Sequence, residues 1–246
     1  MTSTPPLGGF WLPGGTQGIL LIHGYGGTIE DFRDFGAQLQ SAGFSVYAML
    51  VAGHGADVAT LRRATMSDWT GSVDRALGWL QTKTHVVGIM GTSFGGALAL
   101  EAASRHPEID AVVAINTPVG YGRSQWGTKL LLRLLRLWTP YLRKPGLQAA
   151  DRQRYERQGW LTAWPISGLL ETYRFIEQKF LPALPHIKAR VLLMQSGRDE
   201  YIRRDSAMVI GKKYGRPPGL PRPNDYGIVK NQVYLCLFWS QTKILH

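Results

Sequence analysis

The chain has 246 residues, enough for one sizeable hydrophobic core, and its 44% hydrophobic content is ordinary for a globular protein. Cys236 is the only cysteine, which excludes an internal disulfide and a thiolate metal cluster. No stretch reaches the ~18 apolar residues of a membrane span, and residues 1–6 lack the basic and apolar regions of a signal peptide. This composition predicts a soluble, cytoplasmic protein that inserts in no membrane.

The formal net charge of +11 is concentrated in one segment. Residues 121–190 contain 13 Lys or Arg and only 4 Asp or Glu. Such a segment attracts nucleic acid, anionic lipid or acidic substrates. No nucleic-acid motif accompanies the charge, so a solvated basic face is the favoured interpretation and no nucleic-acid partner is expected.

The N-terminal part of the chain predicts a strand, a helix and a second strand. Residues 18–22 are apolar and bounded by glycines, which suits a strand buried on both faces. Thr28 is the expected N-cap of a helix, because acidic residues occupy the first turn after it. Gly43 ends this helix, and residues 44–50 form the next strand.

Further strands and helices alternate downstream. Ser67 is the expected cap of a second helix, and residues 97–103 form a third. Apolar runs at residues 85–90, 111–115 and 191–195 predict three more strands. The second helix has one apolar face, formed by Trp69, Val73, Leu77 and Leu80. Strands that alternate with helices indicate an α/β fold with a mostly parallel sheet and right-handed crossovers.

Residues 119–187 interrupt this alternation. They are rich in Leu, Arg, Trp and Pro and are expected to be mostly helical. Because they lie between two strands of one sheet, they must pass over the carboxyl ends of the strands, where ligands bind in open α/β sheets. This position predicts a lid. Residues 130–138 are apolar nearly all round, and packing and pocket lining are favoured over contact with a lipid surface.

Ser93 lies in the most informative motif, Gly-Thr-Ser-Phe-Gly at residues 91–95, between the third strand and a helix. A serine presented from a sharp strand-to-helix turn needs glycine neighbours, because the backbone folds tightly on both sides. This setting predicts a nucleophile that attacks esters or amides. The expected oxyanion donors are the backbone N–H groups of Phe94 and of Tyr25, the latter in the glycine-rich loop at residues 23–27.

Four motifs in this order together resemble the α/β-hydrolase fold, and more narrowly bacterial carboxylesterases and monoacylglycerol-lipase-like enzymes. They are the loops at residues 23–27 and 53–55, the Ser93 turn, and the strand end at residues 196–199. The resemblance implies an acid at Asp199, with Glu200 and Asp205 as weaker candidates. It also implies a small-molecule ester substrate, no metal site and no cofactor.

The resemblance implies a division of the chain. Residues 1–118 and 188–210 would form the α/β-hydrolase core, with residues 119–187 as its helical cap. Four prolines and three glycines between residues 211 and 223 are incompatible with the expected helix and strand. Residues 211–246 are therefore expected to be an atypical tail that replaces the family's sequence after Ile210, as a frameshift would produce. Loss of the terminal strand would expose a sheet edge and predicts poor solubility.

The histidine of the triad is not evident in the sequence. In this fold the triad follows the order Ser, Asp, His, and His246 is the only histidine after Asp199. His23 and His54 are expected to hold loops together, and the remaining three are expected to be structural or exposed, namely His85, His106 and His186. Two functions remain open: an active serine esterase, or a non-catalytic or truncated member that acts as a binding scaffold.

Overall fold

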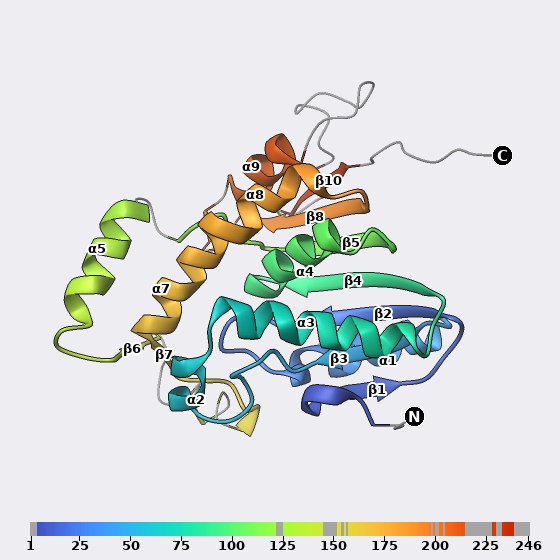
Figure 1. Ribbon diagram of the computed structural model, residues 1–246, viewed down its shortest axis with the longest axis horizontal. Helices are drawn as coiled ribbons and strands as arrows, with labels where there is room; N and C mark the ends of the chain where they lie inside the picture. Colours follow the sequence, from blue (N-terminus) through green and yellow to red (C-terminus); the bar gives the residue numbers. More distant parts are fainter. Residues whose placement is uncertain are drawn as a thin grey trace.

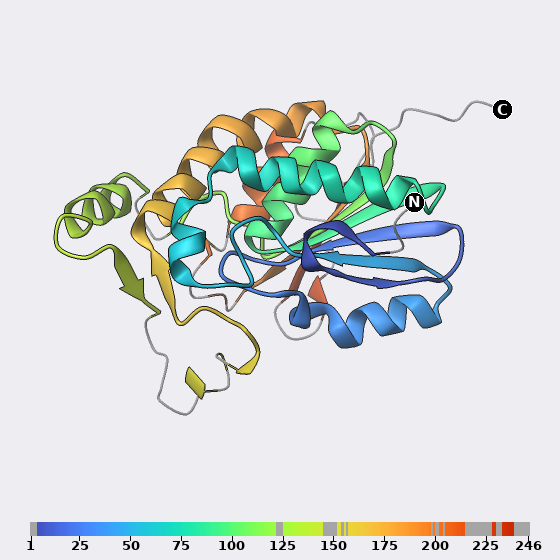
Figure 2. The same ribbon diagram turned by 60° about the horizontal axis from the view of Figure 1, so that its bottom comes forward.

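The computed structural model describes residues 4–121, 125–144, 152, 153, 155, 157–197, 199, 202, 203, 205–214, 228, 229 and 233–238. At its centre lies an eight-stranded sheet with the strand order β1-β3-β2-β4-β5-β8-β10-β9 (Figure 1). Helices α3 and α4 cover one face of the sheet and α1 covers the other (Figure 2). These layers confirm the predicted α/β architecture.

Five parallel strands form the middle of the sheet and confirm the five predicted strands. They are β2 (Gln17–Ile22), β3 (Ser45–Met49), β4 (Val86–Thr92), β5 (Ile109–Ile115) and β8 (Arg190–Ser196). All five residues of β3 are buried, as expected of a strand covered on both faces. The short η1 (Pro6–Gly8) precedes β1 (Phe10–Leu12), which pairs antiparallel with β3 at one end of the sheet.

The helices before β5 begin at caps that the sequence encodes. Thr28 precedes η2 (Ile29–Phe32), which continues as α1 (Arg33–Ser41), and its Oγ1 accepts the Glu30 N–H at 3.2 Å, as predicted. Ser67, however, is not the cap of α3 (Met66–Gln81). Thr65 caps it, because its side chain and that of Asp68 each accept the other residue's backbone N–H, at 3.3 and 2.9 Å. The remaining helices here are α2 (Val58–Arg63) and α4 (Phe94–Arg105).

The main core lies between the sheet and helices α3 and α4. Trp69, Phe94 and Phe175 are completely buried there and meet edge to face, with ring centroids 5.0 and 5.3 Å apart. Such edge-to-face pairs add to the free energy of burial. The first turn of α4 is therefore fixed by aromatic packing directly beneath Ser93.

The segment between β5 and β8 forms the predicted excursion from the sheet. It contains α5 (Gln125–Leu135), β6 (Tyr141–Arg143), β7 (Ala163–Pro165), α7 (Ile166–Phe175), η3 (Ile176–Phe180), α8 (Leu181–Ala183) and η4 (Leu184–His186). Helix α5 projects at one end of the molecule (Figures 1 and 2). Helices α7, η3 and α8 follow one another without a break, and η3 and α8 pack alongside α4. Phe175, Phe180 and Leu184 join the main core, so the second half of the excursion packs on α4. The β6–β7 hairpin was not predicted.

The expectation that residues 130–138 pack against the protein is largely wrong. Leu132 is buried, with 5% of its surface exposed, but Leu137 and Trp138 are 79% and 89% exposed. The reason is geometric: an all-round apolar helix can bury only the stripe that faces its neighbours. In the described part of the chain, no helix combines the length and the hydropathy needed to cross a bilayer.

The C-terminal end of the sheet differs from its middle. Helix α9 (Ser206–Lys213) ends three residues after Ile210, and β10 (Val233–Phe238) then pairs antiparallel with β8. Strand β9 (Ile228–Val229) pairs antiparallel with β10. The parallel order is therefore lost where an atypical tail was predicted, but the expectation that β8 is left as an open edge is wrong. His246 lies outside the described residues.

Candidate active site

Ser93 occupies a strained turn between β4 and α4. Its φ of 53° and ψ of −124° lie in a region that L-residues rarely adopt. A Cβ at Gly91 would lie 2.2 Å from the Gly95 carbonyl oxygen, and a Cβ at Gly95 would lie 2.2 Å from that of Ile22. Only glycine fits at both positions, so the predicted strand–turn–helix geometry is confirmed. The turn places Ser93 on the wall of a cavity.

The two predicted oxyanion residues lie on either side of Ser93. Phe94 is the first residue of α4, whose N-terminus carries the positive end of the helix dipole. The loop with Tyr25 follows β2, and a Cβ at Gly24 would lie 3.2 Å from Ser93 Cβ. That contact is tight, so a side chain at position 24 would require Ser93 to shift by a few tenths of an ångström. The backbone of this loop therefore lies against the serine, where an oxyanion donor is needed.

The Tyr25 side chain is held by packing. Its ring contacts Trp69, Phe94 and His54 edge to face, and its buried hydroxyl has no hydrogen-bond partner among the described residues. A Cβ at Gly168 would overlap that hydroxyl at 1.8 Å, so α7 approaches Tyr25 through a glycine. Burial raises the pKa of Tyr25 well above its ordinary value. The loop is thus packed against both α4 and α7.

Asp199 lines the same cavity as Ser93. It follows β8, and its Oδ1 accepts the Ile202 N–H at 2.8 Å. Asn116, at the end of the neighbouring β5, has a φ of 47° and accepts the Ser196 N–H at 2.7 Å, which ties the two strand ends together. Of the weaker acid candidates, Asp205 is paired with Arg203 at 2.6 Å, which lowers the pKa of Asp205. The other candidate, Glu200, lies outside the described residues.

The cavity measures about 630 Å³ and is enclosed by both the core and the segment between β5 and β8. Its volume is in the range of sites for small organic ligands. One wall is mainly apolar and comes from β5, α5, β6, α7 and the loop before α5: Ile115, Tyr121, Leu132, Leu142, Leu169 and Tyr173. This wall suits an acyl chain, and Leu132 belongs to the run of residues 130–138 for which pocket lining was predicted.

The lining of the cavity also contains two charged residues that sequence reasoning missed as site residues. Lys144 Nζ lies 4.9, 5.1 and 5.3 Å from the ring centroids of Tyr155, Trp160 and Trp164. Asp31 lines the same region. Burial lowers the pKa of Lys144 to about 8 and raises that of Asp31 to about 6. No motif marks this pair, because it forms only when distant segments meet.

The described histidines do not reach the cavity. His23 Nε2 accepts the Val51 N–H at 3.1 Å and its Nδ1 donates to Gly24 O at 2.9 Å, so it joins two loops as predicted. Burial lowers the pKa of His23 to about 4, and burial beside His23 lowers that of His54 to about 3. His106 lies between Asp74 and Glu108 on the surface. Among the described residues, no histidine lines the wall that carries Ser93.

Comparison with known proteins agrees with this geometry. The profile of the family described as "Serine aminopeptidase, S33" matches residues 16–216. The chain belongs to this serine hydrolase family. The matched range covers both Ser93 and Asp199, and it ends six residues after Ile210, close to where the sequence predicted that family similarity stops.

Curated relatives of this S33 family chain include ester hydrolases. A thermostable monoacylglycerol lipase from Bacillus sp. (strain H-257) is 36% identical over 110 residues, which are 45% of this chain and 44% of that protein. The carboxylesterase of Bacillus subtilis (strain 168) is 28% identical over 111 residues, 45% of each chain. The matches thus span less than half the length of these relatives.

Solved structures show the same fold. A structure reported for the metagenome-derived lipolytic enzymes LipS and LipT superposes with a TM-score of 0.72 and 23% identity, over 87% of this chain and 85% of that chain. Paleococcus ferrophilus monoacylglycerol lipase superposes with a TM-score of 0.66 and 20% identity, over 84% of each chain. These similarities establish the α/β-hydrolase fold that the motifs predicted.

Proposed function

We propose that the chain is a serine hydrolase of small carboxylic esters, of the carboxylesterase or monoacylglycerol lipase type. The observation that carries this proposal is the strained Ser93 turn opening on a cavity of about 630 Å³ that Asp199 also lines. The printed names of the curated relatives support the same substrate class. The apolar wall around Leu132 suits the acyl group of such an ester.

In the proposed reaction, Ser93 Oγ attacks the ester carbonyl carbon and loses its proton to a base. The carbonyl electron pair moves to oxygen, and the backbone N–H groups of Tyr25 and Phe94 donate hydrogen bonds to the oxyanion. Collapse breaks the bond to the alcohol, which leaves with a proton, and an acyl-enzyme remains. Water then attacks this ester, releases the carboxylic acid and regenerates Ser93.

The base is the part of the proposal that needs its own test. Serine is a weak nucleophile without an adjacent imidazole, which an acid such as Asp199 orients. His246 is the only histidine after Asp199 and is our candidate. The cap role of residues 119–187 over a core of residues 1–118 and 188–210 is likewise a proposal, supported by the mixed origin of the cavity walls. A cytoplasmic location remains a prediction.

The test compares wild type with Ser93→Ala and His246→Ala on a short-chain chromogenic ester. Ser93→Ala should abolish release above background, because removing the nucleophile of a triad costs several orders of magnitude in kcat. His246→Ala should lower turnover similarly if His246 is the base, and unchanged turnover would exclude it. A burst of one equivalent of alcohol without further turnover would mean that Ser93 becomes acylated but that the acyl-enzyme is not hydrolysed. Wild type that matches Ser93→Ala throughout would overturn the proposal and favour a binding scaffold.

A further inference from the structure

The exposed side of α5 carries mainly apolar side chains, with Arg133 among them. We call it the outer face, and it continues through the turn after the helix: Trp126, Leu130, Leu131, Leu134, Leu137 and Trp138, between 40% and 89% exposed. Trp126, Leu130 and Leu134 follow one another at steps of four and form a stripe along the helix, and Trp138 continues the series in the turn after it. Single exposed apolar residues are ordinary, but a contiguous patch of this kind marks a binding surface.

The same helix is well packed on its other side, so its exposure does not come from a loose position. Leu132 is buried with Tyr173 of α7 in a separate small core. Thr128 and Leu132 also line the cavity of Ser93. Helix α5 therefore separates the cavity from the surroundings of the molecule, and its outer face is left without a partner in the described part of the chain.

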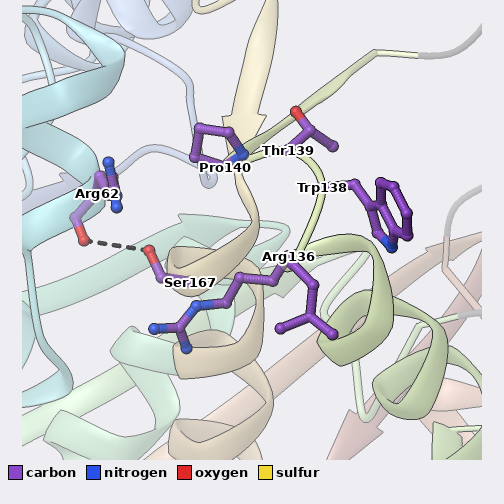
Figure 3. A pocket seen from close by; sticks show the side chains of 7 residues that line it. Arg62, Arg136, Trp138, Thr139, Pro140 and Ser167 are labelled. Carbon is purple, nitrogen blue, oxygen red and sulfur yellow. Dashed lines mark hydrogen bonds between the residues drawn. The ribbon is translucent and has the colours of Figure 1, made fainter.

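A hollow of about 290 Å³ adjoins the C-terminal end of the outer face (Figure 3). Arg62 from α2, Arg136 and Trp138 from the turn after α5, and Ser167 from α7 line it. Figure 3 shows the Arg136 side chain reaching toward Ser167, on the side of the hollow that Arg62 occupies. Ser167 Oγ donates to the Arg62 carbonyl oxygen at 3.3 Å, which joins the two walls.

Among the residues that the structure describes, neither guanidinium in the hollow has an acidic partner. The ion pairs within the described residues involve neither Arg62 nor Arg136. The charge of the sequence around α5 is also entirely positive, because residues 122–150 contain six Lys or Arg and no Asp or Glu. Arginine pairs bind phosphate bidentately, and no described carboxylate competes for these two.

We propose that the outer face docks on the surface of an anionic phospholipid bilayer. In this arrangement the apolar side chains enter the boundary between headgroups and acyl chains, and Arg62 and Arg136 hold a lipid phosphate in the hollow. An apolar helix face with flanking arginines and tryptophans has the composition of an interfacial anchor. The charge argues against a second copy of the chain as occupant, because Arg62, Arg133 and Arg136 of the two copies would repel one another.

The test is sedimentation of the full-length chain with phosphatidylcholine vesicles, with and without phosphatidylglycerol. We expect binding to the anionic vesicles that weakens at high salt. Arg62→Gln/Arg136→Gln should weaken it about 25-fold, since each basic residue near an anionic surface contributes about five-fold. Leu137→Ala/Trp138→Ala should weaken it at least about tenfold through the loss of buried apolar area. All four positions are accessible from solvent, and circular dichroism would verify that the variants fold.

Matched controls separate this surface from general charge and hydropathy. Arg75→Gln/Lys83→Gln removes two exposed charges on and after α3, and Phe35→Ala/Met208→Ala removes two exposed apolar side chains elsewhere. Both should bind like wild type. The proposal is overturned if wild type does not bind anionic vesicles, or if the control pairs weaken binding as much as the tested pairs. Self-association that the Leu137/Trp138 pair abolishes, without vesicle binding, would assign the face to a second copy instead. None of these results depends on ester hydrolysis.

Discussion

The strain at Ser93 predicts that removing the nucleophile can stabilise the protein. In Ser93→Gly the positive φ is no longer costly, which should recover about 1–3 kcal/mol of strain. The greater backbone freedom of glycine in the unfolded state offsets about 0.5–1 kcal/mol of this gain. The net free energy of unfolding should therefore rise by up to about 2 kcal/mol. For a chain of this length, each kcal/mol corresponds to a rise in Tm of roughly 2–4 °C.

Ser93→Ala is the matched control, because it also removes the hydroxyl but keeps a Cβ in the strained turn. Both variants should be inactive, so a difference in Tm between them reports backbone strain and not the loss of a hydrogen bond. Differential scanning calorimetry at one protein concentration measures it. If Ser93→Gly unfolds at the same temperature as Ser93→Ala or below it, the turn is not strained and the reasoning fails.

Three substitutions and one pH titration test the fold further. Gly95→Ala would place a Cβ 2.2 Å from a carbonyl oxygen of β2 and should cost at least about 1–3 kcal/mol by urea unfolding, whereas Gly78→Ala, with nothing within 4 Å, should stabilise α3 by about 0.5–1 kcal/mol. Thr65→Ala should cost about 1 kcal/mol through loss of the α3 cap. Because burial lowers the pKa of His23 to about 4 and that of His54 to about 3, the unfolded chain takes up protons first. The free energy of unfolding should fall as pH drops from about 6.5 toward 4, and a flat profile over that range would contradict their buried, neutral state.

Much of the fold and part of the candidate site could be predicted because the information is local. Apolar runs bounded by glycines identify buried strands such as β2 and β3 without knowledge of their partners. The Ser93 turn is recognised from five consecutive residues, although its glycines are required by atoms of α4 and of the end of β2. The loop of Tyr25 was predictable for the same reason. Its distance from Ser93 in sequence did not matter, because both follow strands of one parallel sheet.

The rest depends on contacts that no short pattern encodes. Asp31 reads as a helix-start acid and Lys144 as a surface charge, and only the approach of the segment between β5 and β8 to the loop after β2 brings both to the cavity wall. The antiparallel pairing of β10 with β8 is likewise a tertiary outcome, because an apolar run does not specify strand direction. Thr65 was overlooked in favour of Ser67, although the acid three residues after Thr65 is the signal of a capping box.

Hydropathy alone did not decide whether the residues of α5 are packed or exposed, because the helix has both kinds. It also connects the proposed ester hydrolysis at Ser93 with the proposed docking on a lipid surface. Leu132 lines the cavity while Leu131, the residue before it, is 55% exposed, so one short helix contacts both the proposed substrate site and the proposed lipid surface. The two roles use different side chains and should separate. Arg62→Gln/Arg136→Gln should leave hydrolysis of a water-soluble ester unchanged, because neither arginine lines the cavity of Ser93. The same variant should slow hydrolysis of an ester embedded in anionic vesicles by about the factor lost in vesicle binding. Equal loss on both substrates would mean that the arginines support the cavity itself and not the approach to a membrane.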